Sequence, residues 1–317
     1  MKINICALSD IGNERTNNED AVSICPDLTK MTWCCNANKG YASLSPLGAV
    51  SVVADGMGGA NAGEIASSLV IENIEKSFQG ADYEKILVSD NEIYTFLKDS
   101  ITESNKAILD YVVESPDSIG LGTTIVLLWL VKGKAYVAWC GDSRCYCFNP
   151  NSGLKLLTKD HSLVQELVDK GDIKVEDAFS HPNNNIITRC LGDIDADTEP
   201  EYLAHDIEDG DIFLLCSDGL CGYCRDSKIE KVMYKHFDNI DKCLQSLLQL
   251  ALNAGGQDNI SISLCATLPD SQKTKIGFMG RIKRFVYRWL YMVCSVLNNL
   301  TVLKKHYQDE KSSQVLY

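Results

Sequence analysis

Short runs of apolar, largely β-branched residues recur along the chain, and each one predicts a strand. The expected strands cover residues 2–9, 50–53, 125–131, 135–140, 145–148, 154–157, 211–216 and 260–266. Lys132-Gly133-Lys134 has the composition of a tight turn and joins two of these strands as a hairpin.

Apolar residues spaced three or four apart predict helices between these strands. The expected helices cover residues 61–78, a segment from Ser89 or Asp90 to just before Pro116, about 163–170, 226–237 and 241–252. Strands in successive hairpins, with helices arriving in pairs, favour antiparallel sheets covered by helices, so the expected fold class is α+β. Residues 26–46 are interpreted as an extended hairpin connection, and residues 158–200 as an excursion that forms a flap over a site.

Acidic residues stand at the ends of several expected strands. The apolar run 50–53 leads to Asp55, and four glycines follow it within eight positions. The same arrangement of an acid beside an apolar run recurs at Glu19-Asp20, Asp142, Asp218 and Asp258. A turn with a capping acid would account for one such position. Five such positions in one domain indicate that the acids act together.

Net charge is distributed unevenly over the 317 residues. Residues 272–317 hold nine Lys and Arg against two acids, a charge of +7, so the first 271 residues carry −20 of the total of −13. An acidic body lacks the basic face that phosphate backbones require, which argues against nucleic acid as a partner. A phosphate-bearing substrate would therefore need bound cations to attract it.

The fourteen cysteines do not require a disulfide framework, since many lie inside apolar runs, where a reduced cysteine packs as a small hydrophobic group. One CxxC occurs at Cys221–Cys224, but it lacks the second pair that a structural zinc site needs. The first ten residues contain no long apolar core of the signal-peptide kind, so the expected location is cytoplasmic.

Aspartates from different strands, flanked by glycines, suit hard divalent ions such as Mg²⁺ or Mn²⁺, which prefer oxygen ligands. Two such ions, about 3.5–4 Å apart, hold a hydroxide and direct it at phosphorus. Arg15, close in sequence to Glu19 and Asp20, suits bidentate binding of phosphoryl oxygens. Histidines are scarce near these acids, and His161 is interpreted as a packed or flap residue rather than a ligand. The pattern predicts metal-assisted phosphate hydrolysis.

Eight short motifs resemble, in order, those of the PP2C (PPM) family of metal-dependent protein serine/threonine phosphatases. They are Arg15…Asn18-Glu19-Asp20, Val53-Ala-Asp-Gly-Met-Gly-Gly59, Gly122-Thr-Thr124, Gly141-Asp-Ser-Arg144, Leu157-Thr…Asp160-His161-Ser162, Ile187-Thr-Arg-Cys-Leu-Gly192, Ser217-Asp-Gly219 and Gly256-Gln-Asp-Asn259. The resemblance spans residues 1 to about 267 and implies a sandwich of two antiparallel sheets flanked by pairs of helices.

The resemblance also implies roles for individual residues. Asp55 would bridge two ions, the Gly56 carbonyl would ligate one of them, and Arg15 would bind the phosphate. Four further acids would complete the site: Glu19 and Asp20 at the ion pair, with Asp20 acting through water, and Asp218 and Asp258 as direct ligands. Asp142 matches an acid that helps hold a weaker third ion in bacterial members.

One departure concerns Met57, where eukaryotic members carry a histidine proposed as general acid. Bacterial-type members share the methionine, so the resemblance implies a bacterial enzyme that opposes a cognate Ser/Thr kinase. Two alternatives stay open. The first is a binding module that has lost catalysis, and the presence of all six acids argues against it. The second is a regulatory scaffold that acts through its tail.

The expected domains are a catalytic domain over residues 1–268 and a basic tail over 269–317. Within the tail, residues 281–303 place apolar residues on one side of a predicted helix and basic and polar ones on the other. Arg288 and Asn298-Asn299 interrupt the roughly 20 apolar residues that a span requires. Peripheral contact with the inner membrane face is the favoured expectation. Docking on a partner or on the protein's own acidic body, and a true membrane span, are the alternatives.

Overall fold

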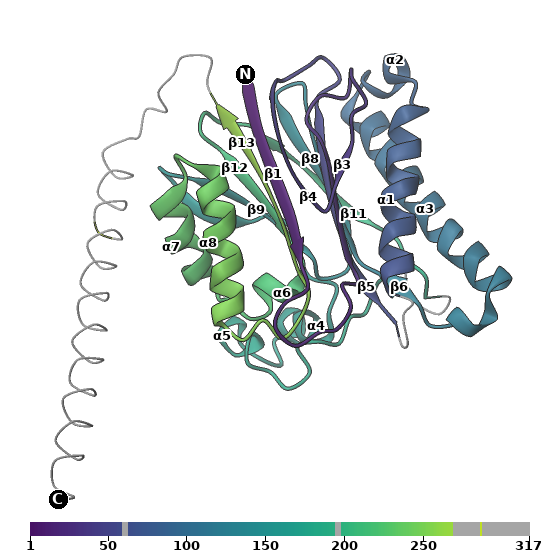
Figure 1. The fold of residues 1–317 in the computed structure, drawn as a ribbon, viewed down its shortest axis with the longest axis vertical. Helices are drawn as coiled ribbons and strands as arrows, with labels where there is room; N and C mark the ends of the chain where they lie inside the picture. The colour runs from purple at the N-terminus through teal and green to yellow at the C-terminus, as the bar shows by residue number, and fades with distance from the viewer. Residues whose placement is uncertain (59–62, 194–197, 269–285, 287–317) are drawn as a thin grey trace, which may run out of the picture.

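Two antiparallel sheets lie face to face at the centre of the computed structural model, which describes residues 1–58, 63–193, 198–268 and 286 (Figure 1). In spatial order, the first sheet contains β10 (Gly153–Leu156), β9 (Arg144–Asn149), β12 (Ile212–Cys216), β13 (Ile260–Leu268), β1 (Lys2–Asp10) and β4 (Ala37–Ser43). The second contains β11 (Glu201–Asp206), β8 (Lys134–Cys140), β7 (Ile125–Val131), β5 (Ala49–Met57), β2 (Asp20–Cys25) and β3 (Cys34–Cys35), with β6 (Gly122–Thr123) paired to the end of β5.

A pair of helices covers the outer face of each sheet (Figure 1). The pair α1 (Gly63–Gln79) and α3 (Asp90–Glu114) packs on the second sheet, and α7 (Asp226–His236) and α8 (Ile240–Asn253) pack on the first. Two short helices, α2 (Tyr83–Ile86) and the 3₁₀ turn Pro116–Ser118, flank α3. This architecture confirms the predicted α+β sandwich.

Strand β7 shows why its sequence is continuously apolar. Ile125, Leu127 and Trp129 belong to the cluster under α1 and α3, whereas Val126 and Leu128 belong to the cluster between the sheets. Because successive side chains of a strand point to opposite faces, a strand covered on both sides is buried at every position. The predicted bounds 125–131 are those observed.

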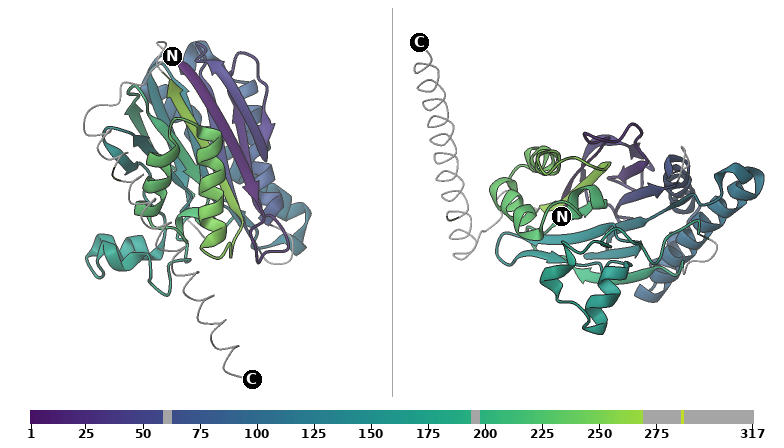
Figure 2. Two further views of the ribbon diagram at one scale, coloured as in Figure 1. Left: turned by 60° about the vertical axis from the view of Figure 1, so that its left-hand side comes forward. Right: turned by 90° about the horizontal axis from the view of Figure 1, so that it is seen from below.

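The predicted excursion contains α4 (Leu163–Lys170) and α5 (Val175–Ala178), which project from the sandwich as a flap (Figure 2, teal). Ser162 caps α4 by accepting a hydrogen bond from the Gln165 amide, and Gly171 ends it in the left-handed conformation that glycine adopts without strain. The expected helix bounds 163–170 are also those observed.

Three strand predictions were incomplete. Residues 26–46 are not only a connection, because β3 and β4 lie within them and β4 pairs along most of β1. Strand β11, at the edge of the second sheet, was missed because its charged, half-exposed sequence lacks an apolar run. Strand β5 continues past Asp55 to Met57, since β6 supplies a pairing partner there.

The predicted amphipathic helix over 281–303 lies outside the described residues, apart from Val286. Within the part of the chain that the structure describes, no helix combines the length and apolarity needed to cross a bilayer.

Candidate metal centre

The predicted acids converge at the end of the sandwich where α6 (Asp218–Cys221) lies (Figure 1). Asp20, the first residue of β2, pairs directly opposite Asp55 of β5. Asp142 occupies the turn between β8 and β9, Asp218 opens α6 immediately after β12, and Asp258 precedes β13. Neighbouring strands from both sheets therefore bring together acids that lie far apart in the sequence.

Mutual repulsion and burial shape the ionisation of this cluster. Burial raises the pKa of Asp55 well above its usual value, and the carboxylates of Asp20, Asp218, Asp142 and Asp258 raise it further. The pKa of Asp142 is likewise raised well above the usual range by burial and by Asp218, while Arg144 opposes the shift. Several carboxylates in a buried space favour either protonation or a bound cation.

The pKa values of Asp20 and Asp218 are also raised. Burial raises the pKa of Asp20 to about 7, although hydrogen bonds from Ser217 and Ser261 counteract part of the shift. Burial and Asp258 raise the pKa of Asp218 to about 6. The pKa of Glu19 is raised by burial and by Glu64, a residue in the first turn of α1, and Arg15 opposes the change.

The donor set fits hard divalent ions. The Oδ1 atom of Asp142 is buried and has no hydrogen-bond partner among the described residues, and the same holds for Oε2 of Glu64. Buried oxygens without partners are costly in a protein, and a cation satisfies them. The converging ligands are carboxylates, as Mg²⁺ and Mn²⁺ prefer.

Gly56 allows the chain to pass close to the cluster. A Cβ atom at this position would lie 2.2 Å from the Gly63 carbonyl oxygen and 2.4 Å from that of Glu19. The Gly56 amide donates to the Glu19 carbonyl at 3.2 Å. Only glycine fits between these two backbones, so the start of α1 and the acid-bearing loop before β2 both approach β5 here.

Arg15 lies beside the cluster, with its Nη2 atom 2.8 Å from Oδ2 of Asp258. Its side chain is 48% exposed, so the guanidinium lies at the mouth of the site rather than inside it. This position suits a group that meets a phosphate arriving from solvent while remaining tied to an acid of the cluster.

Ser217 and Asn259 hold predicted acids and their loops in place, but they were not among the residues predicted from the sequence. The Ser217 hydroxyl donates to Oδ2 of Asp20 at 2.7 Å and accepts from the Ser261 amide at 2.9 Å. The Asn259 side chain donates to the carbonyls of Ile11 and Asn17, and its oxygen accepts from the Glu19 amide at 2.8 Å. Their signal was their place in the Ser217-Asp-Gly219 and Gly256-Gln-Asp-Asn259 motifs.

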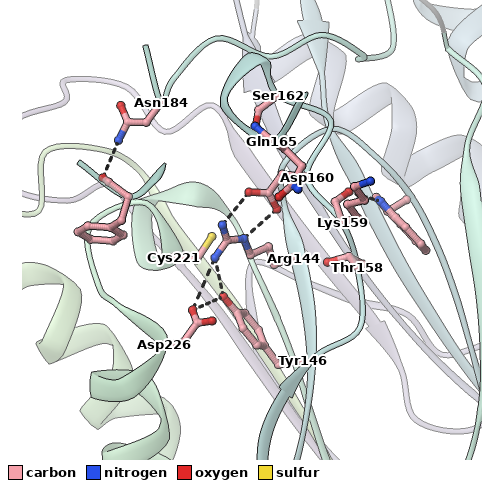
Figure 3. Close-up of polar contacts among 12 residues, drawn as sticks. Arg144, Tyr146, Thr158, Lys159, Asp160, Ser162, Gln165, Asn184, Cys221 and Asp226 are labelled. Carbon is pink, nitrogen blue, oxygen red and sulfur yellow. Dashed lines mark hydrogen bonds and ion pairs between the residues drawn. The ribbon is translucent and has the colours of Figure 1, made fainter. Parts of the chain in front are cut away.

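Arg144, two residues after Asp142 in the sequence, is held by polar side chains on both sides of its guanidinium (Figure 3). Its guanidinium donates to both oxygens of Asp160, at 2.8 and 2.6 Å, and to the Tyr146 hydroxyl at 2.9 Å. The Oδ1 atom of Asp226 lies 3.6 Å from the Nη1 atom of Arg144. The paired carboxylate ties the start of the flap to β9.

A groove of about 870 Å³ extends from Asp142 and Asp218 to the flap helices. Arg225, at the start of α7, stacks its guanidinium 4.4 Å from the ring centroid of Phe179 in the flap, and both residues line the groove. The excursion predicted from the sequence therefore forms one wall of a groove that begins at the acids.

Other sequence interpretations also agree with the structure. His161 is buried, stacks on Trp139, and accepts a hydrogen bond from the Gly141 amide at its Nδ1 atom. Cys221 and Cys224 are buried in the cluster under α7 and α8, and the structure shows no disulfide among the cysteines it describes.

Comparisons with known proteins agree with this geometry. The family model described as protein phosphatase 2C matches residues 7–260. The serine/threonine phosphatase Stp of Listeria welshimeri is 35% identical over 215 residues, which cover 68% of this chain and 83% of that relative.

Two solved structures are similar over most of the described sandwich. The Streptococcus agalactiae serine/threonine phosphatase has a TM-score of 0.69 and 32% identity, covering 83% of this chain and 98% of its own. The catalytic domain of the serine/threonine protein phosphatase PstP, in complex with two manganese ions, has a TM-score of 0.67 and 29% identity, covering 85% and 100%. This chain belongs to the protein phosphatase 2C family, as a phosphatase of the bacterial type.

Proposed function

We propose that this chain hydrolyses phosphoserine and phosphothreonine in proteins, with two divalent ions held by the buried acids, and that it opposes a Ser/Thr kinase. The observation that carries the proposal is the convergence of buried aspartates: the pKa values of Asp20, Asp55, Asp142 and Asp218 are raised, and an oxygen of Asp142 has no hydrogen-bond partner among the described residues. When bound, Mn²⁺ or Mg²⁺ ions would supply Lewis acidity and an activated water for attack on phosphorus.

The residues of the chain would bind the ions and orient the substrate. Asp55, Asp218 and Asp258 would hold the ions directly, with Glu19, Asp20 and the Gly56 carbonyl completing the site and Asp142 serving a weaker third ion. Arg15 would bind and orient the phosphoryl group at the mouth. The groove beside the flap would hold the peptide that follows or precedes the phosphorylated residue.

The substrate class is tested with three peptides of one sequence that carry phosphoserine, phosphothreonine or phosphotyrosine at the same position. We expect Mn²⁺-dependent release of phosphate from the first two, measured with a phosphate-binding dye, and much slower release from the third. Equal release from phosphotyrosine, or release from none by the ion-loaded protein, would refute the proposed substrate class.

Ion binding should stabilise the fold more at high pH than at low pH. The folded-state pKa of Asp20 is about 7, above the value of about 3.9 for an unfolded aspartate, so the free energy of unfolding of the ion-free protein falls as pH rises between these values. Bound ions remove this penalty, whereas protons compete with ions at low pH. The rise in Tm on adding millimolar Mg²⁺ should be larger at about pH 8 than at about pH 5, and an equal rise at both would contradict the role of the acids.

The tail over residues 269–317 remains a prediction. Its charge and apolar spacing support peripheral contact with an anionic membrane. We expect the full-length chain to co-sediment with anionic vesicles in a salt-sensitive manner, and a chain ending at Leu268 to remain in the supernatant. Equal binding by both chains, or by neither, would exclude the tail as an anchor.

A further inference from the structure

A second group of potential ligands lies at the other end of the sandwich from the acids. Cys147 of β9, His205 of β11 and Asp211, just before β12, place one ligand atom each within 4.8 Å of one another. Asp211 directly precedes β12 and Asp218 lies beyond its other end, and the five residues of this strand span about 17 Å. The group is therefore separate from the catalytic cluster.

The three donors match a transition-metal site in both chemistry and spacing. The Cys147 sulfur lies 3.7 Å from Nε2 of His205, and that nitrogen lies 3.4 Å from Oδ2 of Asp211. Tetrahedral Zn²⁺ with ordinary bond lengths would separate sulfur from nitrogen by about 3.6 Å and nitrogen from oxygen by about 3.4 Å. Thiolate and imidazole favour zinc or cobalt over magnesium.

Neighbouring groups hold Asp211 in place, as the supporting residues of a metal site do. Its Oδ1 atom accepts a hydrogen bond from the Asn149 side chain at 2.8 Å, and its Oδ2 atom accepts from the Glu208 amide at 2.9 Å. Its carbonyl accepts from the Thr267 amide and hydroxyl. The carboxylate is thus fixed before any ion arrives, at the point where β12 enters the first sheet.

Burial differs among the three side chains in a way that permits ion entry. The side chain of Asp211 is 3% exposed, whereas that of His205 is 25% exposed. Solvent therefore reaches the imidazole side of the group, from which an ion and its solvent ligand would enter. Cys147 is buried, and burial together with Asp211 raises the pKa of its thiol, so the sulfur carries a proton when no ion is present.

We propose that Cys147, His205 and Asp211 bind one Zn²⁺ or similar borderline ion, with a solvent molecule as fourth ligand. On binding, the Cys147 S–H bond breaks, the sulfur bonds to the ion, and the proton passes to solvent. The ion would connect β11, the edge strand of the second sheet, to β9 and β12 of the first. This site would be independent of the oxygen-ligated ions of the catalytic centre.

Cobalt provides a direct probe because its bond to a thiolate produces a charge-transfer absorption that oxygen ligands do not. The full-length protein is stripped of metals, supplied with excess Mg²⁺ to fill the oxygen-lined sites, and titrated with Co²⁺. We expect one equivalent of Co²⁺ to produce the thiolate band and one equivalent of Zn²⁺ to abolish it. Absence of the band would show that the triad is only a hydrogen-bonded network.

Variants assign the band to these residues. Cys147→Ser should abolish the thiolate band, and His205→Gln should weaken Co²⁺ binding at least about tenfold. Cys35→Ser, which changes an exposed thiol outside the triad, should leave the titration unchanged. Should Cys147→Ser fail to fold, as judged by circular dichroism, the variant of the more exposed His205 decides the question. An unaltered titration in His205→Gln, or an unaltered band in folded Cys147→Ser, would overturn the proposal.

Discussion

Replacing Asp218 by Asn is expected to reduce kcat on a phosphomonoester by about 10²- to 10⁴-fold while the protein remains folded. The change keeps the shape of the side chain but removes a charged oxygen that we assign to an ion. Lewis-acid stabilisation of the transition state contributes several kcal/mol, and each 1.36 kcal/mol corresponds to about a tenfold change in rate. Steady-state kinetics at saturating Mn²⁺ would measure the loss.

Stability measurements distinguish this loss from general damage. In the ion-free protein, burial and Asp258 raise the pKa of Asp218, so a neutral Asn relieves repulsion and Tm should not fall. The rise in Tm on adding Mn²⁺ should shrink in the variant. Asp117→Asn, an exposed substitution far from the cluster in sequence, serves as the matched control and should retain both activity and ion response. Asp218→Asn with normal kcat would remove Asp218 from the site.

The second large effect is expected for Arg15→Ala, which should raise KM about 10- to 100-fold with a smaller change in kcat. A charge-assisted hydrogen bond contributes about 1.5–3 kcal/mol, and a group that binds phosphate equally in the ground and transition states affects KM. The ion pair with Asp258 is half exposed on the arginine side, so its loss should cost at most about 1 kcal/mol of stability.

Arg15→Lys is the informative companion variant, since it keeps the charge but lacks the planar fork that binds two oxygens. We expect it to have an intermediate KM. An Arg15→Ala protein with unchanged KM and reduced Mn²⁺ affinity would mean that Arg15 acts only through Asp258, as an ion-pair partner of the metal site.

Elements with a clear local sequence pattern could be predicted from the sequence. Strands that form only because a neighbouring strand pairs with them could not. The bounds of strand β7 follow from its uninterrupted apolar run, and those of helix α4 from the capping residue Ser162 and the terminating Gly171. Strand β11 is mostly polar or half exposed, and it forms because β8 offers a paired edge. The extension of β5 past Asp55 likewise depends on β6, which is distant in the sequence.

The same distinction applies to the sites. The predicted acids each stand near an apolar run, with a glycine or a second acid within two positions, so a local pattern identified them. Ser217 and Asn259 act through hydrogen bonds to residues about 200 positions away, which no local pattern reveals. Cys147, His205 and Asp211 have no recognisable spacing, and only the pairing of β11 with the second sheet beside β9 and β12 brings them together.

The central claim is that the buried aspartates hold the divalent ions on which hydrolysis depends. The most direct test removes the ions by chelation and dialysis, and then measures bound Mn²⁺ and phosphopeptide hydrolysis on the same samples during readdition. The account predicts a folded, inactive ion-free protein whose activity returns in parallel with Mn²⁺ occupancy of the acid cluster. Full activity in the ion-free protein, or saturation of the cluster with Mn²⁺ and no activity, would contradict it.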